Sequence, residues 1–144
     1  MGFVPKHGKE FERQERPSRR FNDYKGELEE VNVKNGAFVL DAGCGSGVVS
    51  RYLAERFPAS WVIACDENAA LIETARNSAQ KIPNLFYEEQ DLRRLKYPDG
   101  HFDLIVSRHV LYRRDPDSLK RILSEFARIL TPDGKLVVIE TDGG

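Results

Sequence analysis

The hydrophobic residues of this chain alternate between short continuous runs and a spacing of three or four positions. Runs typical of strands buried on both faces occur at 37–40, 61–65, 85–87, 102–107 and 136–139. Helical spacing predicts helices at 21–31, 48–57, 68–79 and 116–130. Strands separated by helices of this length indicate βαβ units, which form a parallel sheet with helices on both faces. The pattern therefore predicts an α/β three-layer sandwich.

The first 20 residues lack this pattern. They are rich in glycine, proline and charged residues and have few apolar anchors, so we expect a poorly ordered basic arm at 1–20 and one domain at 21–144. Residues 1–25 hold seven Lys/Arg against four Asp/Glu, whereas the rest of the chain holds 15 against 19. A short basic arm is more often solvated than bound to nucleic acid, so a nucleic-acid partner is not expected.

The overall composition indicates an ordinary globular protein, with 40% hydrophobic and 31% charged residues and a net charge of −1. No apolar run approaches the roughly 20 residues that span a bilayer, and the N-terminus has no signal-peptide core. We therefore expect a cytoplasmic protein without a membrane partner. The two cysteines and three histidines lack metal-ligand spacing, so no metal site is predicted.

A glycine-rich loop follows the first predicted strand and opens a helix. It runs Asp41-Ala42-Gly43-Cys44-Gly45-Ser46-Gly47. Glycines permit tight turning and close approach of a ligand, and the helix start offers free N–H groups. Asp66 ends the second predicted strand about 20 residues later, where a carboxylate can hold ribose hydroxyls. The loop has the spacing G-x-G-x-G, whereas dinucleotide-binding loops have G-x-G-x-x-G, so NAD is disfavoured.

Residues 39–47 resemble motif I of the class I S-adenosylmethionine-dependent methyltransferases. Further motifs follow in that family's order: Asp66, then Glu89-Gln90-Asp91-Leu92, then 102–107, then 130–134. The resemblance covers roughly residues 31–141 and is closest to the branch that contains small-molecule and quinone methyltransferases. It implies a Rossmann-like fold, S-adenosyl-L-methionine as cofactor and S-adenosyl-L-homocysteine as product.

The resemblance also implies roles for individual residues. Gly43 and Gly45 would let the backbone pass the methionine part of the cofactor, and Asp41 would orient the loop near its amino group. Asp66 would hold the ribose, the N–H of Leu92 would read adenine together with Asp91, and Ser107 would face the reacting centre. Taken singly, these acids and hydroxyls could also be helix or turn caps. The implied cofactor-binding residues are Asp41, Ala42, Gly43, Cys44, Gly45, Gly47, Asp66, Glu67, Asn68, Asp91, Leu92 and Ser107.

The catalytic residues are not evident from the sequence. Methyl transfer from a sulfonium is a direct displacement, to which alignment and desolvation contribute most. His109 is a weak candidate base, since a lone histidine more often has a packing role. Arg108, Arg113 and Arg114 follow the fourth predicted strand and favour an acidic acceptor, although a solvated charged loop is the default interpretation.

We therefore predict S-adenosylmethionine-dependent methyl transfer to a small or acidic acceptor. The alternative is a cofactor-binding module that is not competent alone and is completed by a partner or serves a regulatory role. A nucleic-acid methyltransferase is disfavoured, because 107–110 lacks the Asn/Asp-Pro-Pro-aromatic signature of enzymes that methylate base amino groups.

The family's sheet has seven strands in the order 3-2-1-4-5-7-6, and the sequence here runs only to the fifth. We expect a sheet of order 3-2-1-4-5 without strands six and seven. The fifth strand would then present an apolar, unpaired edge. A homodimer or other partner contact through this strand and the helix at 116–130 would cover it; cover by residues 1–30 is the rival prediction.

Overall fold

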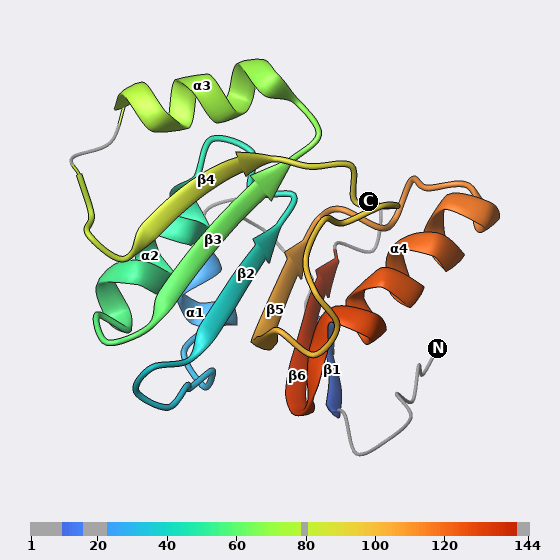
Figure 1. Cartoon of the computed structure of the whole chain (residues 1–144), viewed down its shortest axis with the longest axis horizontal. Helices are drawn as coiled ribbons and strands as arrows, with labels where there is room; N and C mark the ends of the chain where they lie inside the picture. Colours follow the sequence, from blue (N-terminus) through green and yellow to red (C-terminus); the bar gives the residue numbers. More distant parts are fainter. Residues whose placement is uncertain (1–9, 16–22, 79–80, 141–144) are drawn as a thin grey trace.

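A parallel sheet forms the centre of the molecule (Figure 1). The computed structural model describes residues 10–15, 23–78 and 81–140, and within them six strands pair in the order β1-β6-β5-β2-β3-β4. Every neighbouring pair is parallel. The strands are β1 (Glu10–Glu15), β2 (Phe38–Ala42), β3 (Trp61–Asp66), β4 (Leu85–Glu89), β5 (Phe102–Arg108) and β6 (Leu130–Glu140). From β4 to β6 the order is the predicted 3-2-1-4-5, which confirms the Rossmann-like fold.

Helices lie on both faces of the sheet. They are α1 (Tyr24–Glu27), α2 (Val48–Arg56), α3 (Ala69–Ser78) and α4 (Pro116–Ile129). α4 covers one face and α1 and α2 the other (Figure 1). α4 begins where the sequence predicts, because the Asp115 side chain accepts from Ser118 N at 3.0 Å and Pro116 opens the helix. α1 is shorter than the predicted helix at 21–31, and turns follow it from Leu28 onward.

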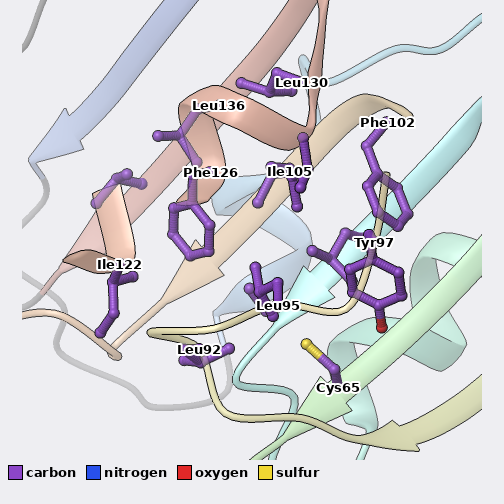
Figure 2. Close-up of a cluster of buried hydrophobic side chains, with 14 of the residues drawn as sticks. Cys65, Leu92, Leu95, Tyr97, Phe102, Ile105, Ile122, Phe126, Leu130 and Leu136 are labelled. Carbon is purple, nitrogen blue, oxygen red and sulfur yellow. The ribbon is translucent and has the colours of Figure 1, made fainter. Parts of the chain in front are cut away.

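The core on the α4 side includes the segment between β4 and β5, which forms no helix. Figure 2 shows Leu92, Leu95 and Tyr97 of this segment packed among side chains of β5, β6 and α4. Arg128 of α4 fixes the segment, since its guanidinium donates to Leu95 O at 2.9 Å and Tyr97 O at 2.8 Å. The residues that follow β4 are therefore held firmly against the sheet.

β1 pairs with the outer edge of β6, from Glu10 opposite Lys135 to Glu15 opposite Glu140. The expectation of a poorly ordered arm is therefore wrong for Glu10–Glu15, and the other residues of 1–20 lie outside the described residues. Backbone pairing leaves no mark in hydrophobic spacing, so the sequence pattern did not reveal this strand. Of the two predicted covers for this edge, pairing within the chain replaces the partner contact along 135–140.

Each helix in the described part of the chain is too short or too polar to cross a membrane. The described residues also include no group of three or more His, Cys, Asp or Glu placed to hold a metal ion.

Candidate functional site

The predicted site residues converge on the carboxyl edge of the sheet. β2 and β5 are neighbours there although the chain passes through β3 and β4 between them, so the edge includes a topological switch point, where ligands bind in folds of this kind. Ala42 at the end of β2 lies opposite Ser107 of β5. Asp66 ends β3, and Asp91 follows β4. Two parts of this edge differ in chemistry, and we call them the β2–β5 side and the β3–β4 side.

The glycine loop turns tightly through left-handed backbone conformations. Gly43, Gly45 and Gly47 have φ angles of 81°, 56° and 91°. A Cβ on Gly43 would lie 2.4 Å from Cγ2 of Val110, so only glycine fits against the turn after β5. A Cβ on Gly45 would meet nothing within 4 Å. The loop is thus packed closely at its start and open above its centre.

β3 holds this loop in place. The N–H groups of Gly43 and Cys44 both donate to Cys65 O, at 2.8 and 2.9 Å. Burial raises the pKa of the Cys44 and Cys65 thiols, so both stay protonated at neutral pH. Cys44 therefore contributes to the site through its backbone, and Cys65, which the sequence did not single out, anchors the loop through its carbonyl.

The β2–β5 side consists of Asp41, Ser107 and the groups around them. Asp41 and Ser107 are buried, with 2% and 0% exposure, and among the described residues neither Asp41 Oδ2 nor Ser107 Oγ has a hydrogen-bond partner. Burial raises the pKa of Asp41 to about 7, and Asp66 adds to the rise, while the Ser50 hydroxyl and Arg108 oppose it. A buried carboxylate oxygen without a partner is costly, and a cationic ligand group would relieve it.

Arg108 and Glu27 form an ion pair beside Asp41. Arg108 Nε donates to Glu27 Oε1 at 2.8 Å, and the side chains are 13% and 3% exposed. This pair ties α1 to the end of β5. Sequence reasoning missed Glu27, because its partner lies 81 positions away and no local pattern links them.

The end of β6 holds the turn that follows β5. Glu140 Oε2 accepts from the N–H groups of Val110 and Leu111 at 3.2 and 3.4 Å, and Ile139 O accepts from His109 N at 2.8 Å. Glu140 is a second residue that the sequence did not indicate. It keeps Val110 in the position where that side chain packs on Gly43.

His109, the candidate base, has a left-handed backbone with φ of 57°. Burial and the neighbouring Arg108 lower its pKa, and Glu27 and Glu140 act in the opposite direction. The ring is therefore neutral at pH 7, the form that can accept a proton. Its role in proton transfer stays a prediction.

On the β3–β4 side, hydrogen bonds within the chain occupy the predicted ligand-binding groups. Asp66 Oδ2 accepts from Gly45 N at 3.0 Å, and Oδ1 accepts from Asn68 N at 2.8 Å. Asn68 Oδ1 accepts from Ala70 N and Leu71 N at 3.0 and 3.2 Å, so its side chain caps α3. Each Asp66 oxygen retains a second lone pair, which leaves capacity for a ribose hydroxyl.

Asp91 and Glu67 each accept a hydrogen bond from an arginine side chain. Asp91 Oδ1 accepts from the backbone N and side-chain Nε of Arg93 at 2.9 and 3.1 Å, which lowers the pKa of Asp91. Glu67 Oε1 accepts from Leu92 N at 3.4 Å and from Arg114 Nη1 at 3.2 Å. A hollow of about 590 Å³ opens at these residues, lined by Glu67, Glu89, Gln90, Asp91, Arg93, Arg94 and Lys96.

Comparison with known proteins identifies the family. Residues 39–134 match the family described as a methyltransferase domain, a span that covers the glycine loop and the other motifs. The chain belongs to the class I S-adenosylmethionine-dependent methyltransferases. Its relatives include quinone methyltransferases, as the resemblance implied.

Three of the similar proteins illustrate the relationship. Trans-aconitate 2-methyltransferase from Deinococcus radiodurans is 39% identical over 71% of this chain and 37% of its own length. Demethylmenaquinone methyltransferase from Lactobacillus johnsonii is 35% identical over 79% and 48%. The crystal structure of a TehB-like methyltransferase from Corynebacterium glutamicum superposes with a TM-score of 0.68 at 31% identity, covering 82% of this chain and 63% of the other. This chain spans less than half the length of the two curated relatives named above.

Membership of the family implies S-adenosyl-L-methionine as the cofactor. The β2–β5 side fits such a ligand, which carries a positive sulfonium and an ammonium group. Asp41 is a buried carboxylate with one unpartnered oxygen, Oδ2, and the open space above Gly45 adjoins the backbone that the ligand would approach.

Proposed function

We propose that this chain binds S-adenosyl-L-methionine at the carboxyl edge of its sheet and that its protein transfers the methyl group to a small acidic acceptor. The observation that supports the proposal best is that two buried polar atoms, Asp41 Oδ2 and Ser107 Oγ, have no hydrogen-bond partner among the described residues. They lie beside a loop whose glycines have left-handed backbone conformations. Buried polar groups are nearly always hydrogen-bonded in folded proteins, so an unpartnered pair at a ligand-binding edge favours a ligand there.

In this proposal, different parts of the cofactor contact the two sides of the edge. Asp41 with the loop at Gly43 and Gly45 would hold the methionine part, and Asp66 would hold the ribose. The N–H of Leu92, with Asp91, would hold adenine. When bound, the cofactor supplies an electrophilic methyl group on a positively charged sulfur, which an acceptor takes by direct displacement.

Arginines after β5 favour an acidic acceptor. Arg113 is exposed on this turn, with its Cζ 5.2 Å from the centre of the Tyr112 ring, and Arg114 follows it. One relative, the trans-aconitate 2-methyltransferase, is named for an organic acid. A carboxylate acceptor is already deprotonated at neutral pH, so it needs no base, which agrees with the absence of an obvious catalytic base in the sequence.

Calorimetric titration tests the cofactor. We expect S-adenosyl-L-homocysteine to bind and NAD not to bind; tighter binding of NAD would overturn the proposal. A radiolabelled methyl transfer assay with a panel of carboxylic acids then tests the acceptor. Arg113→Gln should lower kcat/KM for dicarboxylic acids by about three- to tenfold, the usual effect of losing one exposed charge contact. An equal loss for neutral acceptors would contradict the role of Arg113.

A second candidate function is a cofactor-binding module completed by a partner. The observation that favours it is a similar solved structure, 28% identical with a TM-score of 0.70, in which a putative methyltransferase is in complex with the Haloferax volcanii Trm112 methyltransferase activator. Binding of S-adenosyl-L-homocysteine without methylation of any acceptor would favour this module over the enzyme.

A further inference from the structure

The Leu92 N–H, which is proposed to bind adenine, is already hydrogen-bonded within the protein. Leu92 N donates to Glu67 Oε1 at 3.4 Å. Arg114 Nη1 lies 3.2 and 3.4 Å from the two oxygens of Glu67, and Arg114 Nε donates to Val110 O at 3.2 Å. Glu67 is thus held between Leu92 and Arg114.

This contact spans the edge of the sheet. Glu67 follows β3 and Arg114 lies beyond β5, while β2, which carries the glycine loop, lies between those strands in the sheet. The Arg114–Glu67 ion pair therefore bridges the two elements that flank the carboxyl end of β2.

The three groups differ in their freedom to move. Leu92 is 1% exposed, and its side chain lies in the buried cluster of Figure 2, so its backbone is fixed. The side chains of Glu67 and Arg114 are 38% and 26% exposed. An ion pair at this exposure is weak, and its members can exchange it for water at small free-energy cost. The carboxylate can therefore leave, whereas the N–H stays in place.

We propose that Glu67, held by Arg114, is an internal competitor for the Leu92 N–H and that the Arg114–Glu67 pair opens when adenine binds. This inference rests on the proposed function, because it concerns the affinity of the same site. It assigns Glu67 a role opposite to that of a ligand contact: removing its side chain strengthens cofactor binding.

Three variants test the competition. Glu67→Ala removes the competing acceptor, and Arg114→Gln frees the Glu67 carboxylate to move into solvent. Each should tighten binding of S-adenosyl-L-homocysteine by about two- to fivefold in calorimetric titration, the range expected for one exposed ion pair. The double variant should bind no more tightly than Glu67→Ala alone, because both changes release the same N–H.

Arg121→Gln is the control matched to Arg114→Gln, since Arg121 is an exposed arginine of α4 and both substitutions remove one positive charge. It should leave the affinity unchanged. Weaker binding by Glu67→Ala would show that Glu67 contacts the ligand, and weaker binding by Arg114→Gln would show the same of Arg114; either result overturns the proposal.

Amide exchange of the ligand-free protein gives a readout that does not depend on cofactor binding. The Leu92 amide should exchange faster in Glu67→Ala than in the wild-type chain, and Arg121→Gln should not change it. An unchanged Leu92 exchange rate in Glu67→Ala overturns the competition. Failure of the wild-type chain to bind S-adenosyl-L-homocysteine, with faster Leu92 exchange in the variant, would instead overturn the proposed function and leave the contact established.

Discussion

The β2–β5 side and the β3–β4 side of the site use their polar groups in opposite ways. On the β2–β5 side, Asp41 and Ser107 are buried and each has an oxygen without a hydrogen-bond partner among the described residues. On the β3–β4 side, Asp66, Glu67 and Asp91 accept hydrogen bonds from nearby backbone or arginine groups.

This difference separates two sources of affinity. A ligand group that meets Asp41 gains a charged contact without displacing another, in a place where water competes little. A ligand group that meets Leu92 N–H must first displace Glu67, so only the difference between two contacts remains. We therefore expect substitutions on the β2–β5 side to change cofactor binding more than those on the β3–β4 side.

The largest effect is expected from Gly43→Ala. The new Cβ would lie 2.4 Å from Val110 Cγ2, and φ of 81° adds about 1–2 kcal/mol of backbone strain. Moving the loop away from the turn after β5 should weaken binding of S-adenosyl-L-homocysteine by more than about a hundredfold, given the usual sensitivity of positioned sites to small shifts. Calorimetric titration measures it.

Gly36→Ala separates strain from contact. Gly36 has φ of 82°, and a Cβ there would meet nothing within 4 Å, so this variant should lose only about 1–2 kcal/mol of stability and keep its affinity. Adding Val110→Ala to Gly43→Ala should restore part of the binding. If the double variant binds no better than Gly43→Ala, the clash with Val110 is not the cause.

Asp41→Asn should give the next largest effect, with two opposite consequences. S-adenosyl-L-homocysteine should bind about 10- to 100-fold more weakly, the usual effect of losing a charged hydrogen bond. The ligand-free protein should become more stable at neutral and higher pH, because the substitution removes a carboxylate that is costly to ionise where it is buried. A variant that loses both affinity and stability would indicate a structural role for Asp41.

The pH dependence of Asp41→Asn sharpens this prediction. The folded state raises the pKa of Asp41 from 3.8 to about 7, so its contribution to stability is present below pH 3.8 and is lost as the pH rises through 7. The unfolding free energy of Asp41→Asn should therefore exceed that of the wild type by an amount that grows between pH 4 and 7 and levels off on the order of 4 kcal/mol. Urea denaturation at several pH values measures the difference.

The sequence was sufficient for features that depend on local patterns. The apolar runs predicted the strands from β2 to β6, the family resemblance implied their order, and the spacing of Gly43, Gly45 and Asp66 placed the correct segments at one edge. Contacts between distant residues left no such pattern. The ion pair of Glu27 with Arg108 and the hydrogen bond from Val110 N to Glu140 join segments that come together only when the sheet has folded.

The sequence also could not predict which groups within the chain compete with the ligand for hydrogen bonds. Asp66 and Asp91 match family motifs, yet the sequence could not show that Gly45 N and Arg93 donate to them in the ligand-free chain. Such bonds depend on side-chain rotamers and on loop geometry, which a motif does not specify. The motif therefore identifies the residue but not the partner that a ligand must share or displace.

Asp66→Ala should weaken binding of S-adenosyl-L-homocysteine by about 1–2 kcal/mol, because the ligand shares this carboxylate with Gly45 N and Asn68 N. This loss is smaller than the largest loss expected for Asp41→Asn. Asp66→Ala should also lose stability, since both N–H groups lose their acceptor. Titration and thermal unfolding measure the two effects. Unchanged affinity in a folded variant would mean that Asp66 only caps the turn.

Asn68→Ala should have the smallest effect on binding, although the family resemblance places Asn68 beside the ribose. Its Oδ1 is engaged by Ala70 N and Leu71 N at the start of α3. The variant should lose about 1 kcal/mol of unfolding free energy, the usual effect of removing an N-cap, and should keep its affinity for S-adenosyl-L-homocysteine. Asn68→Asp, which preserves the cap, should keep both. Because the cap and the ribose contact predict different outcomes for Asn68→Ala, a loss of affinity without a loss of stability would assign Asn68 to the ligand and extend the β3–β4 side by one residue.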